Sequence, residues 1–142
     1  MVREAENLEN REDLKLFCVE WLNAWTGNNP EKLIDFYSDD THYQDPANPE
    51  GIKGRKLLFK YFKKLLERNP NWKWELIEFF PTRKGFSFKW KATIPIGTEK
   101  IVEYGMDIVE LDPLFKRKVK RNEVYFDRTR FFSTLKNQKS NE

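Results

Sequence analysis

The sequence predicts an α+β domain in which three helices precede a mostly antiparallel sheet. In the first half of the chain, apolar residues recur at three- and four-residue steps, which is the spacing of amphipathic helices. In the second half they alternate with polar residues, as in half-buried strands. Helices followed by consecutive strands are typical of helices packed on one face of a sheet. The connections between the late strands are short enough for hairpins.

The helices are predicted from their apolar stripes and end signals. The first ends at Gly27-Asn28-Asn29, after a polar stretch at residues 1–9 that we expect to be a flexible arm. Asn29 can cap the second, with Pro30 at its first position and Tyr37 on its buried side. Gly54 opens the third, which Asn69-Pro70 ends. The stripes of the first and third helices contain Leu14, Phe17, Cys18, Trp21, Leu22 and Trp25, then Leu57, Leu58, Tyr61, Phe62, Leu65 and Leu66.

Five strands are expected, the first of which Pro46 stops. Along the fourth, one face carries Gly105 and Asp107, and the other carries Tyr104 and Met106. We expect one domain over residues 10–135 and a polar tail at 136–142. The strands are expected at residues 41–45, 72–76, 86–94, 101–111 and 119–129.

Composition excludes several classes of protein. Charged residues make up 35% of the chain but the net charge is only +3, a mixed surface rather than a nucleic-acid-binding composition. One cysteine permits no internal disulfide, which fits a reducing compartment. The amino terminus has no apolar signal core and no apolar run approaches the ~20 residues that span a bilayer. We therefore expect a soluble, cytoplasmic protein.

Three aspartates lie among apolar neighbours, at Asp45, Asp107 and Asp127. A carboxyl in such a setting is neutral, paired or used in chemistry. For each there is a structural alternative. Asp45 is placed to cap the turn at Pro46. Asp107 could be the buried partner of a Trp, Lys or Arg, and Asp127 could form an ion pair at a strand end.

The order of elements resembles the NTF2-like, SnoaL-like superfamily, in which a strongly curved sheet forms a cone around three helices. The stretch from Phe36 to Pro46 resembles that superfamily's acidic segment before its third helix. Glycines at 51 and 54, the stretch 105–107 and the closing stretch 124–127 are also similar. The resemblance covers about residues 10 to 135 and implies a conical cavity. Because the superfamily contains isomerases, cyclases, epoxide hydrolases and non-catalytic binders, it does not fix the activity.

The resemblance implies roles for individual residues. In ketosteroid-isomerase-like members, Asp45 matches the general base and Asp107 the protonated acid of the oxyanion hole, a system that is a worked case of pKa tuning. Trp21 stands where those members carry a tyrosine, and Tyr37 could supply a hydroxyl. In epoxide-hydrolase-like and cyclase-like members, Asp127 matches an aspartate near the end of the last strand.

These roles lead to the predicted function. We expect a cavity that binds a small, largely apolar molecule carrying a carbonyl or hydroxyl. If the protein is an enzyme, the expected chemistry is proton transfer next to a carbonyl, with Asp45 as base and Asp107 as donor. The alternative is a non-catalytic ligand-binding or interaction module. The expected lining comprises Trp21, Trp25, Tyr37, Tyr61, Phe62 and Trp90.

Other sites receive little support from the sequence. The only histidine, His42, cannot build a His-rich metal site, so we expect no metal and no cofactor. The basic run Lys116–Arg121 is typical of a solvated hairpin tip. Its alternative is an anionic or nucleic-acid contact, but the aromatic residues are not interleaved with it. The apolar face containing Tyr104 and Met106 predicts a homodimer.

Overall fold

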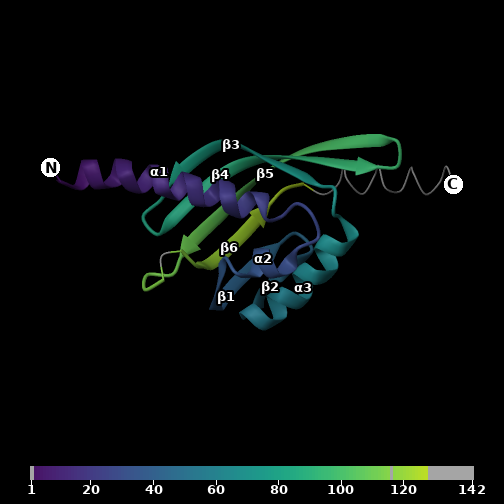
Figure 1. Ribbon diagram of the computed structural model, residues 1–142, viewed down its shortest axis with the longest axis horizontal. Coiled ribbons are helices and arrows are strands. Elements are labelled where there is room, and N and C mark those ends of the chain that lie inside the picture. Colours follow the sequence, from purple (N-terminus) through teal and green to yellow (C-terminus); the bar gives the residue numbers. More distant parts are fainter. Residues whose placement is uncertain (1, 116, 128–142) are drawn as a thin grey trace.

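The computed structural model describes residues 2–115 and 117–127, with side chains described from residue 11 onward. Figure 1 shows a curved sheet with α1 lying along one part of it and α2 and α3 beside β1 and β2. The elements are α1 (Val2–Asn23), α2 (Pro30–Ile34), β1 (Tyr37–Asp45), β2 (Asn48–Lys53), α3 (Arg55–Arg68), β3 (Lys73–Pro81), β4 (Gly85–Ile96), β5 (Glu99–Leu111) and β6 (Val119–Tyr125).

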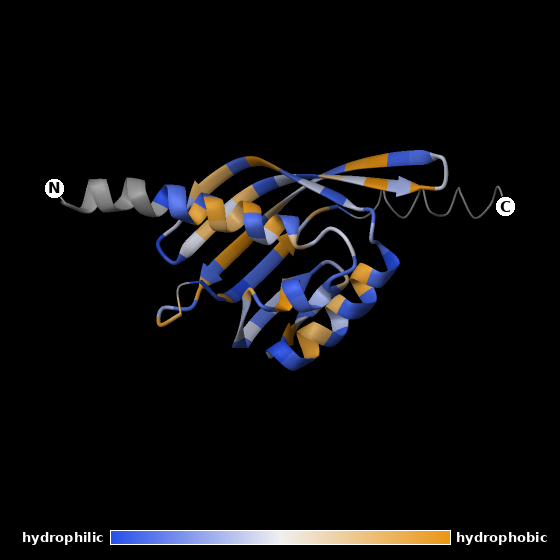
Figure 2. Cartoon of the chain, viewed as in Figure 1, coloured by the Kyte–Doolittle hydropathy of each residue, from blue (hydrophilic) through white to orange (hydrophobic). Residues whose placement is uncertain are grey.

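The six strands form one mixed sheet in the order β2-β1-β6-β5-β4-β3. All neighbours are antiparallel except β1 and β6, which run parallel with Tyr43 opposite Asn122. This curved sheet with three helices confirms the predicted α+β architecture. Its core lies between the sheet and the helices, and both contribute buried apolar side chains to it. Figure 2 shows hydrophobic residues, in orange, along the strands and on the helices.

The helices follow their predicted signals with three differences, one of which is that α1 ends at Asn23, so that Trp25 lies in the turn after α1 and not on its stripe. Asn29 caps α2, accepting a hydrogen bond from the backbone N–H of Lys32 at 3.2 Å, and Pro30 is its first residue. α1 begins at Val2, within the segment that was expected to be an arm. Tyr37 belongs to β1 rather than to α2, because its backbone is in register with Val119 of β6. The prediction that Tyr37 is helical was therefore wrong, although its side chain is buried.

The sequence pattern did not predict β2. It pairs with β1 through Tyr43 and Ile52, although it contains Pro49 and Gly51. Gly51 has φ +87° and a Cβ there would lie 2.5 Å from Nε2 of His42. The imidazole of His42 therefore occupies the place that a side chain at position 51 would fill.

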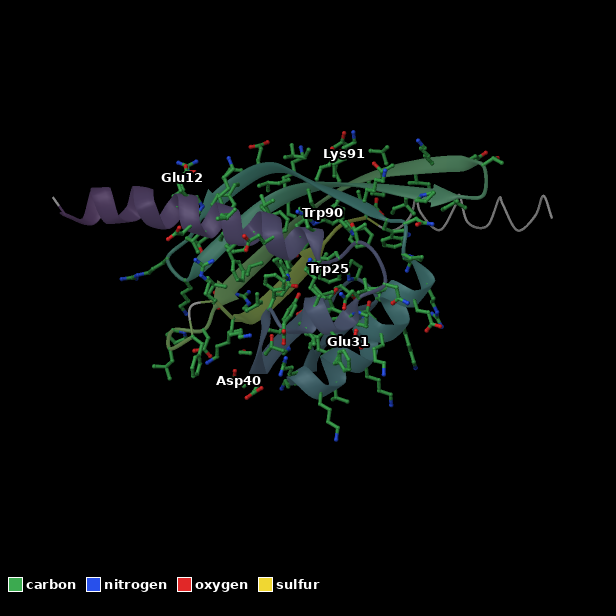
Figure 3. The ribbon with its side chains drawn as sticks, viewed as in Figure 1. Glu12, Trp25, Glu31, Asp40, Trp90 and Lys91 are labelled. Carbon is green, nitrogen blue, oxygen red and sulfur yellow. The ribbon has the colours of Figure 1, made fainter. Side chains whose placement is uncertain are left out.

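The alternation predicted for β4 and β5 is confirmed. Phe86, Phe88, Trp90, Ala92 and Ile94 of β4 are buried, as are Ile101, Glu103, Gly105, Asp107 and Val109 of β5. Gly105 is required because a Cβ there would lie 2.1 Å from the indole of Trp90. Figure 3 shows Trp25 and Trp90 in the middle of the molecule and Lys91 on the outer side of the sheet. The final strand ends at Tyr125, earlier than predicted.

Candidate functional site

Asp45 is the last residue of β1, and its carboxyl accepts five hydrogen bonds while only 8% of the residue is exposed. Oδ1 accepts from the backbone N–H groups of Ala47 (3.0 Å) and Asn48 (2.8 Å) and from Nδ2 of Asn48 (2.9 Å). Oδ2 accepts from the hydroxyls of Tyr43 (2.7 Å) and Tyr61 (2.6 Å). Each of these five groups is a hydrogen-bond donor, which suits a carboxylate, since a carboxylate has acceptor sites only.

Asp107 lies on the inner face of β5 and is 4% exposed. Its Oδ1 accepts from Nε1 of Trp90 at 2.7 Å and its Oδ2 from Nδ2 of Asn122 at 2.9 Å. Burial raises the pKa of Asp107 from 3.8 to about 7, and these two hydrogen bonds only partly oppose that rise. Asp107 therefore exchanges its proton near neutral pH, where an ordinary aspartate is fully ionised.

A chain of hydrogen bonds leads from α1 to Asp107. Nε1 of Trp21 donates to the hydroxyl of Tyr37 at 3.2 Å, and that hydroxyl donates to Oδ1 of Asn122 at 2.8 Å. Asn122 is fully buried and continues the chain to Asp107. Trp21 thus contacts Tyr37 and not the acid itself, and burial raises the pKa of Tyr37 well above 10, which keeps its hydroxyl protonated.

The structure brings Asp45 and Asp107 into the same interior. The charge of Asp45 contributes to the raised pKa of Asp107, so the two carboxyls interact electrostatically. The parallel pairing of β1 with β6 accounts for this proximity. It aligns Tyr43 with Asn122, and these residues hydrogen-bond Asp45 and Asp107 respectively.

Asp127 is not buried as Asp45 and Asp107 are. It follows the end of β6, and its side chain is exposed. In the basic run, Lys120 pairs with Asp40 at 3.5 Å and Arg121 with Glu110 at 2.9 Å. Lys116 lies outside the described residues. The described pairs place part of this basic charge beside acidic side chains.

The six aromatic residues predicted to line a cavity are in or against the core. Trp21, Trp25, Tyr37, Phe62 and Trp90 are buried, and Tyr61 is partly buried. They pack mainly edge to face, as Trp25 does on Phe62 with centroids 5.0 Å apart. The larger of the two clefts described, about 990 Å³, lies elsewhere and is lined by Asp13, Leu14, Phe17, Pro81, Thr82, Arg83, Lys84, Gly85, Glu110, Leu111, Asp112, Pro113, Arg117 and Lys120.

Sequence reasoning missed two residues of this site, Tyr43 and Asn122. Both could have been found by strand parity. Tyr43 is two residues before Asp45 and therefore on the same face of β1. Asn122 is two residues before Val124 and so occupies an inward position on β6. A polar residue at an inward position needs a partner, which Asp107 and Tyr37 provide.

Two further observations concern the described part of the chain. It contains no group of three or more His, Cys, Asp or Glu side chains that could hold a metal ion. None of its helices combines the length and apolar character that crossing a bilayer requires.

Comparisons with known proteins agree with this architecture. A family model described as a SnoaL-like domain matches residues 19–113. No curated protein matches the sequence. One similar solved structure is a hypothetical protein with a ketosteroid isomerase-like fold from Catenulispora acidiphila, in complex with trimethylamine. It is 15% identical, with a TM-score of 0.68 over 78% of this chain and 85% of that one.

Two other similar structures come from proteins named for cyclase chemistry. The epoxide hydrolase/cyclase-like enzyme SalBIII, of pyran ring formation in salinomycin, is 14% identical with a TM-score of 0.69 over 83% of this chain and 93% of that one. A putative SnoaL-like polyketide cyclase from Shewanella putrefaciens is 14% identical with a TM-score of 0.71 over 92% and 87%. At these identities the structures show the fold alone. Because the family model covers most of the chain, the protein belongs to the SnoaL-like domain family, with an NTF2-like, cone-shaped α+β fold.

Proposed function

We propose that this protein binds a small, largely apolar molecule carrying a carbonyl, and transfers a proton next to that carbonyl. Asp107, in its protonated form, donates a hydrogen bond to the oxygen on which negative charge develops. Asp45, in its ionised form, removes the proton from the adjacent carbon. The reaction class is that of isomerases and cyclases, and it needs no cofactor.

The observation that carries the proposal is the state of Asp107. Its pKa of about 7 makes it both a hydrogen-bond donor and a proton acceptor at neutral pH, which an exposed aspartate is not. Burial favours the neutral form of Asp107, whereas the hydrogen bonds donated by Trp90 and Asn122 favour the ionised form and oppose the effect of burial only in part. A neutral carboxylic acid in a buried site is a strong donor to a developing oxyanion.

Asp45 suits the role of base because its surroundings fix its position. The backbone N–H groups of Ala47 and Asn48 hold Oδ1, and the hydroxyls of Tyr43 and Tyr61 hold Oδ2. For proton abstraction one tyrosine hydroxyl must turn away from Oδ2. Tyr61 is the candidate, because it is only partly buried whereas Tyr43 is 2% exposed.

A second candidate function is a non-catalytic binding module of the same fold. The hydrogen bonds of Asp45 favour it, since a carboxyl that caps the turn at Ala47 and Asn48 has a structural role without any chemistry. In that case Asp45 stabilises the β1–β2 hairpin, and Asp107 is a buried polar group satisfied by Trp90 and Asn122.

Exchange of α-protons separates the two candidates without a known substrate. Acetophenone and α-tetralone are incubated with the protein in D₂O, and loss of the α-proton signal is followed by NMR. We expect exchange above the buffer rate, and a loss of about 10²-fold or more in Asp45→Asn and in Asp107→Asn. Asp39→Asn is the matched control, because it removes the same charge from a fully exposed side chain of the same strand.

The result that contradicts catalysis is equally clear. If the wild-type protein does not exceed the buffer rate with either ketone, or if both aspartate variants exchange as fast as Asp39→Asn, the proton-transfer proposal is wrong. Circular dichroism of each variant shows whether it is folded, so that loss of activity is not confused with loss of structure.

A further inference from the structure

Trp74, in β3, has a polar atom that the proposed reaction leaves unused. Its indole Nε1 is buried and has no hydrogen-bond partner in the part of the chain that the structure describes. The indole N–H groups of Trp21 and Trp90, in contrast, donate to Tyr37 and Asp107. A buried donor without an acceptor is costly to folding, so it is retained where something else satisfies it.

The register of the sheet shows what surrounds this indole. Trp74 is opposite Ala92 of β4, and Ala92 is opposite Glu103 of β5, so the three residues form one row across the sheet. Ala92 is fully buried but has only a methyl group. The next row toward Asp107 contains Trp90 and Gly105, and Gly105 has no side chain. On the inner face, Trp74 therefore lies beside the methyl group of Ala92 and the indole of Trp90, which fills the place of a side chain at Gly105.

Trp74 is also close to Asp107. Its ring centroid is 5.0 Å from that of Trp90, at an interplanar angle of 77°. Nε1 of Trp90 is in turn 2.7 Å from the carboxyl of Asp107. A single indole thus separates Trp74 from the acid.

On the other side, rings connect Trp74 to the second carboxyl. Its centroid is 6.2 Å from that of Trp25, which is 6.3 Å from that of Tyr43. The hydroxyl of Tyr43 donates to Asp45. Trp74 therefore contacts Trp90, which donates to Asp107, and Trp25, which packs against the Asp45 donor Tyr43.

Trp74 lies at the border between the core and the solvent. The residue is partly buried, as is its neighbour Trp72 at 5.8 Å, whereas Trp90 is only 2% exposed. The residue as a whole is thus partly exposed, while its Nε1 is buried. A flat molecule that enters between the rings at this border can present an acceptor to Nε1.

We infer that the N–H of Trp74 anchors an uncharged acceptor oxygen of the ligand, such as the carbonyl oxygen of a flat, apolar molecule. The inference rests on the proposed function, because it assigns an anchoring residue for the same ligand. The oxygen is uncharged because Asp45 already raises the pKa of Asp107, and a further anion in this interior would be repelled. Trp74 is a positioning residue and takes no part in proton transfer.

The test uses three probes of similar shape, namely acetophenone, α-methylstyrene (in which CH₂ replaces the oxygen) and benzoate. The protein has five tryptophans, whose indole N–H signals are resolved by ¹⁵N–¹H NMR and assigned with Trp→Phe variants. We expect acetophenone to move the Trp74 signal to lower field, α-methylstyrene to leave it without that shift, and benzoate to bind more weakly than acetophenone.

Affinities provide a second readout. Trp74→Phe keeps an aromatic ring and removes the donor, so we expect it to weaken acetophenone binding by about 5- to 150-fold and to leave α-methylstyrene binding unchanged. Trp72→Phe is the matched control, because it makes the same exchange of an indole for a phenyl ring at the neighbouring position of the same cluster. It should leave the preference for acetophenone over α-methylstyrene intact.

Two outcomes would overturn the inference. One is a Trp74 signal that acetophenone does not move even at the solubility limit of the probe, a result that requires no variant. The other is equal weakening of acetophenone and α-methylstyrene in Trp74→Phe. If α-protons exchange but the Trp74 signal does not move, the anchoring role of Trp74 is refuted and the proposed proton transfer is not. If the Trp74 signal moves but α-protons do not exchange, the proposed proton transfer is refuted and the anchoring role of Trp74 is not.

Discussion

Asp107 makes the stability of this protein depend on pH in a direction opposite to that of a salt-bridged aspartate. The folded protein holds the Asp107 proton up to a pKa of about 7, whereas the unfolded chain releases it near the usual value of 3.8. Between these values the folded state binds more protons than the unfolded state. Raising the pH through this interval therefore lowers the free energy of unfolding.

The size of the effect follows from the same two values. Each pH unit corresponds to about 1.36 kcal/mol, so the interval from 3.8 to about 7 amounts to about 4 kcal/mol. This contribution is fully present below pH 3.8, declines as the pH rises and is gone above about 7. Asp107→Asn keeps an uncharged side chain at every pH and has no such decline.

Urea unfolding at pH values from about 4 to about 8 measures the effect. We expect the wild-type protein to lose about 4 kcal/mol relative to Asp107→Asn across this range. Asp39→Asn should run parallel to the wild type. In Asp45→Asn the decline should end at lower pH, because the neighbouring charge that helps to raise the pKa of Asp107 is removed. Parallel curves for the wild type and Asp107→Asn would refute the reasoning.

Three further predictions concern packing, assembly and reactivity. Gly105→Ala should destabilise the protein by about 1–3 kcal/mol in urea unfolding, because its Cβ would lie 2.1 Å from Trp90, and the cost should be smaller in a Trp90→Leu background. Tyr104 is 51% and Met106 36% exposed on the outer sheet face, through which we expect two copies of the chain, each of 17.2 kDa, to form a homodimer. Sedimentation at micromolar concentration should detect this dimer in the wild type and its loss in Tyr104→Glu. A species of 17.2 kDa in the wild type would contradict the prediction. Cys18 is fully buried, and burial raises the pKa of its thiol. A thiol reagent should therefore label Cys18 only at the rate at which the protein unfolds, and immediate labelling of the folded protein would contradict this.

The sequence predicts well wherever a local pattern determines burial. Alternation along β5 places Asp107 inward and Tyr104 outward, and the structure confirms both. The N-cap at Asn29 is equally local, because it depends on a side chain and a backbone N–H three residues apart. The stripe of α3 identifies the buried Phe62 for the same reason.

The features that were missed depend on pairing between distant segments. β2 contains Pro49 and Gly51 and lacks alternation, so only its partner β1 makes it a strand. The hydrogen bond from Tyr37 to Asn122 joins residues 85 positions apart. Burial of Asn122 follows from strand parity, but its partners do not, because the parallel pairing of β1 with β6 leaves no local pattern in the sequence.

The position of β6 has a consequence for how the protein is made. β6 comes after the other five strands of the sheet in the sequence, yet it lies between β1 and β5. Until β6 is in place, the β1–β2 hairpin and the sheet of β3 to β5 are not joined, and the edges that β6 will pair with, β1 and β5, are unpaired. The chain from Met1 to Leu111 therefore has neither the hydrogen-bond chain to Asp107 nor the alignment of Tyr43 with Asn122. The acidic interior is assembled only after β6 has been synthesised, and until then the unpaired edges are the surfaces at which a nascent chain is most exposed to aggregation.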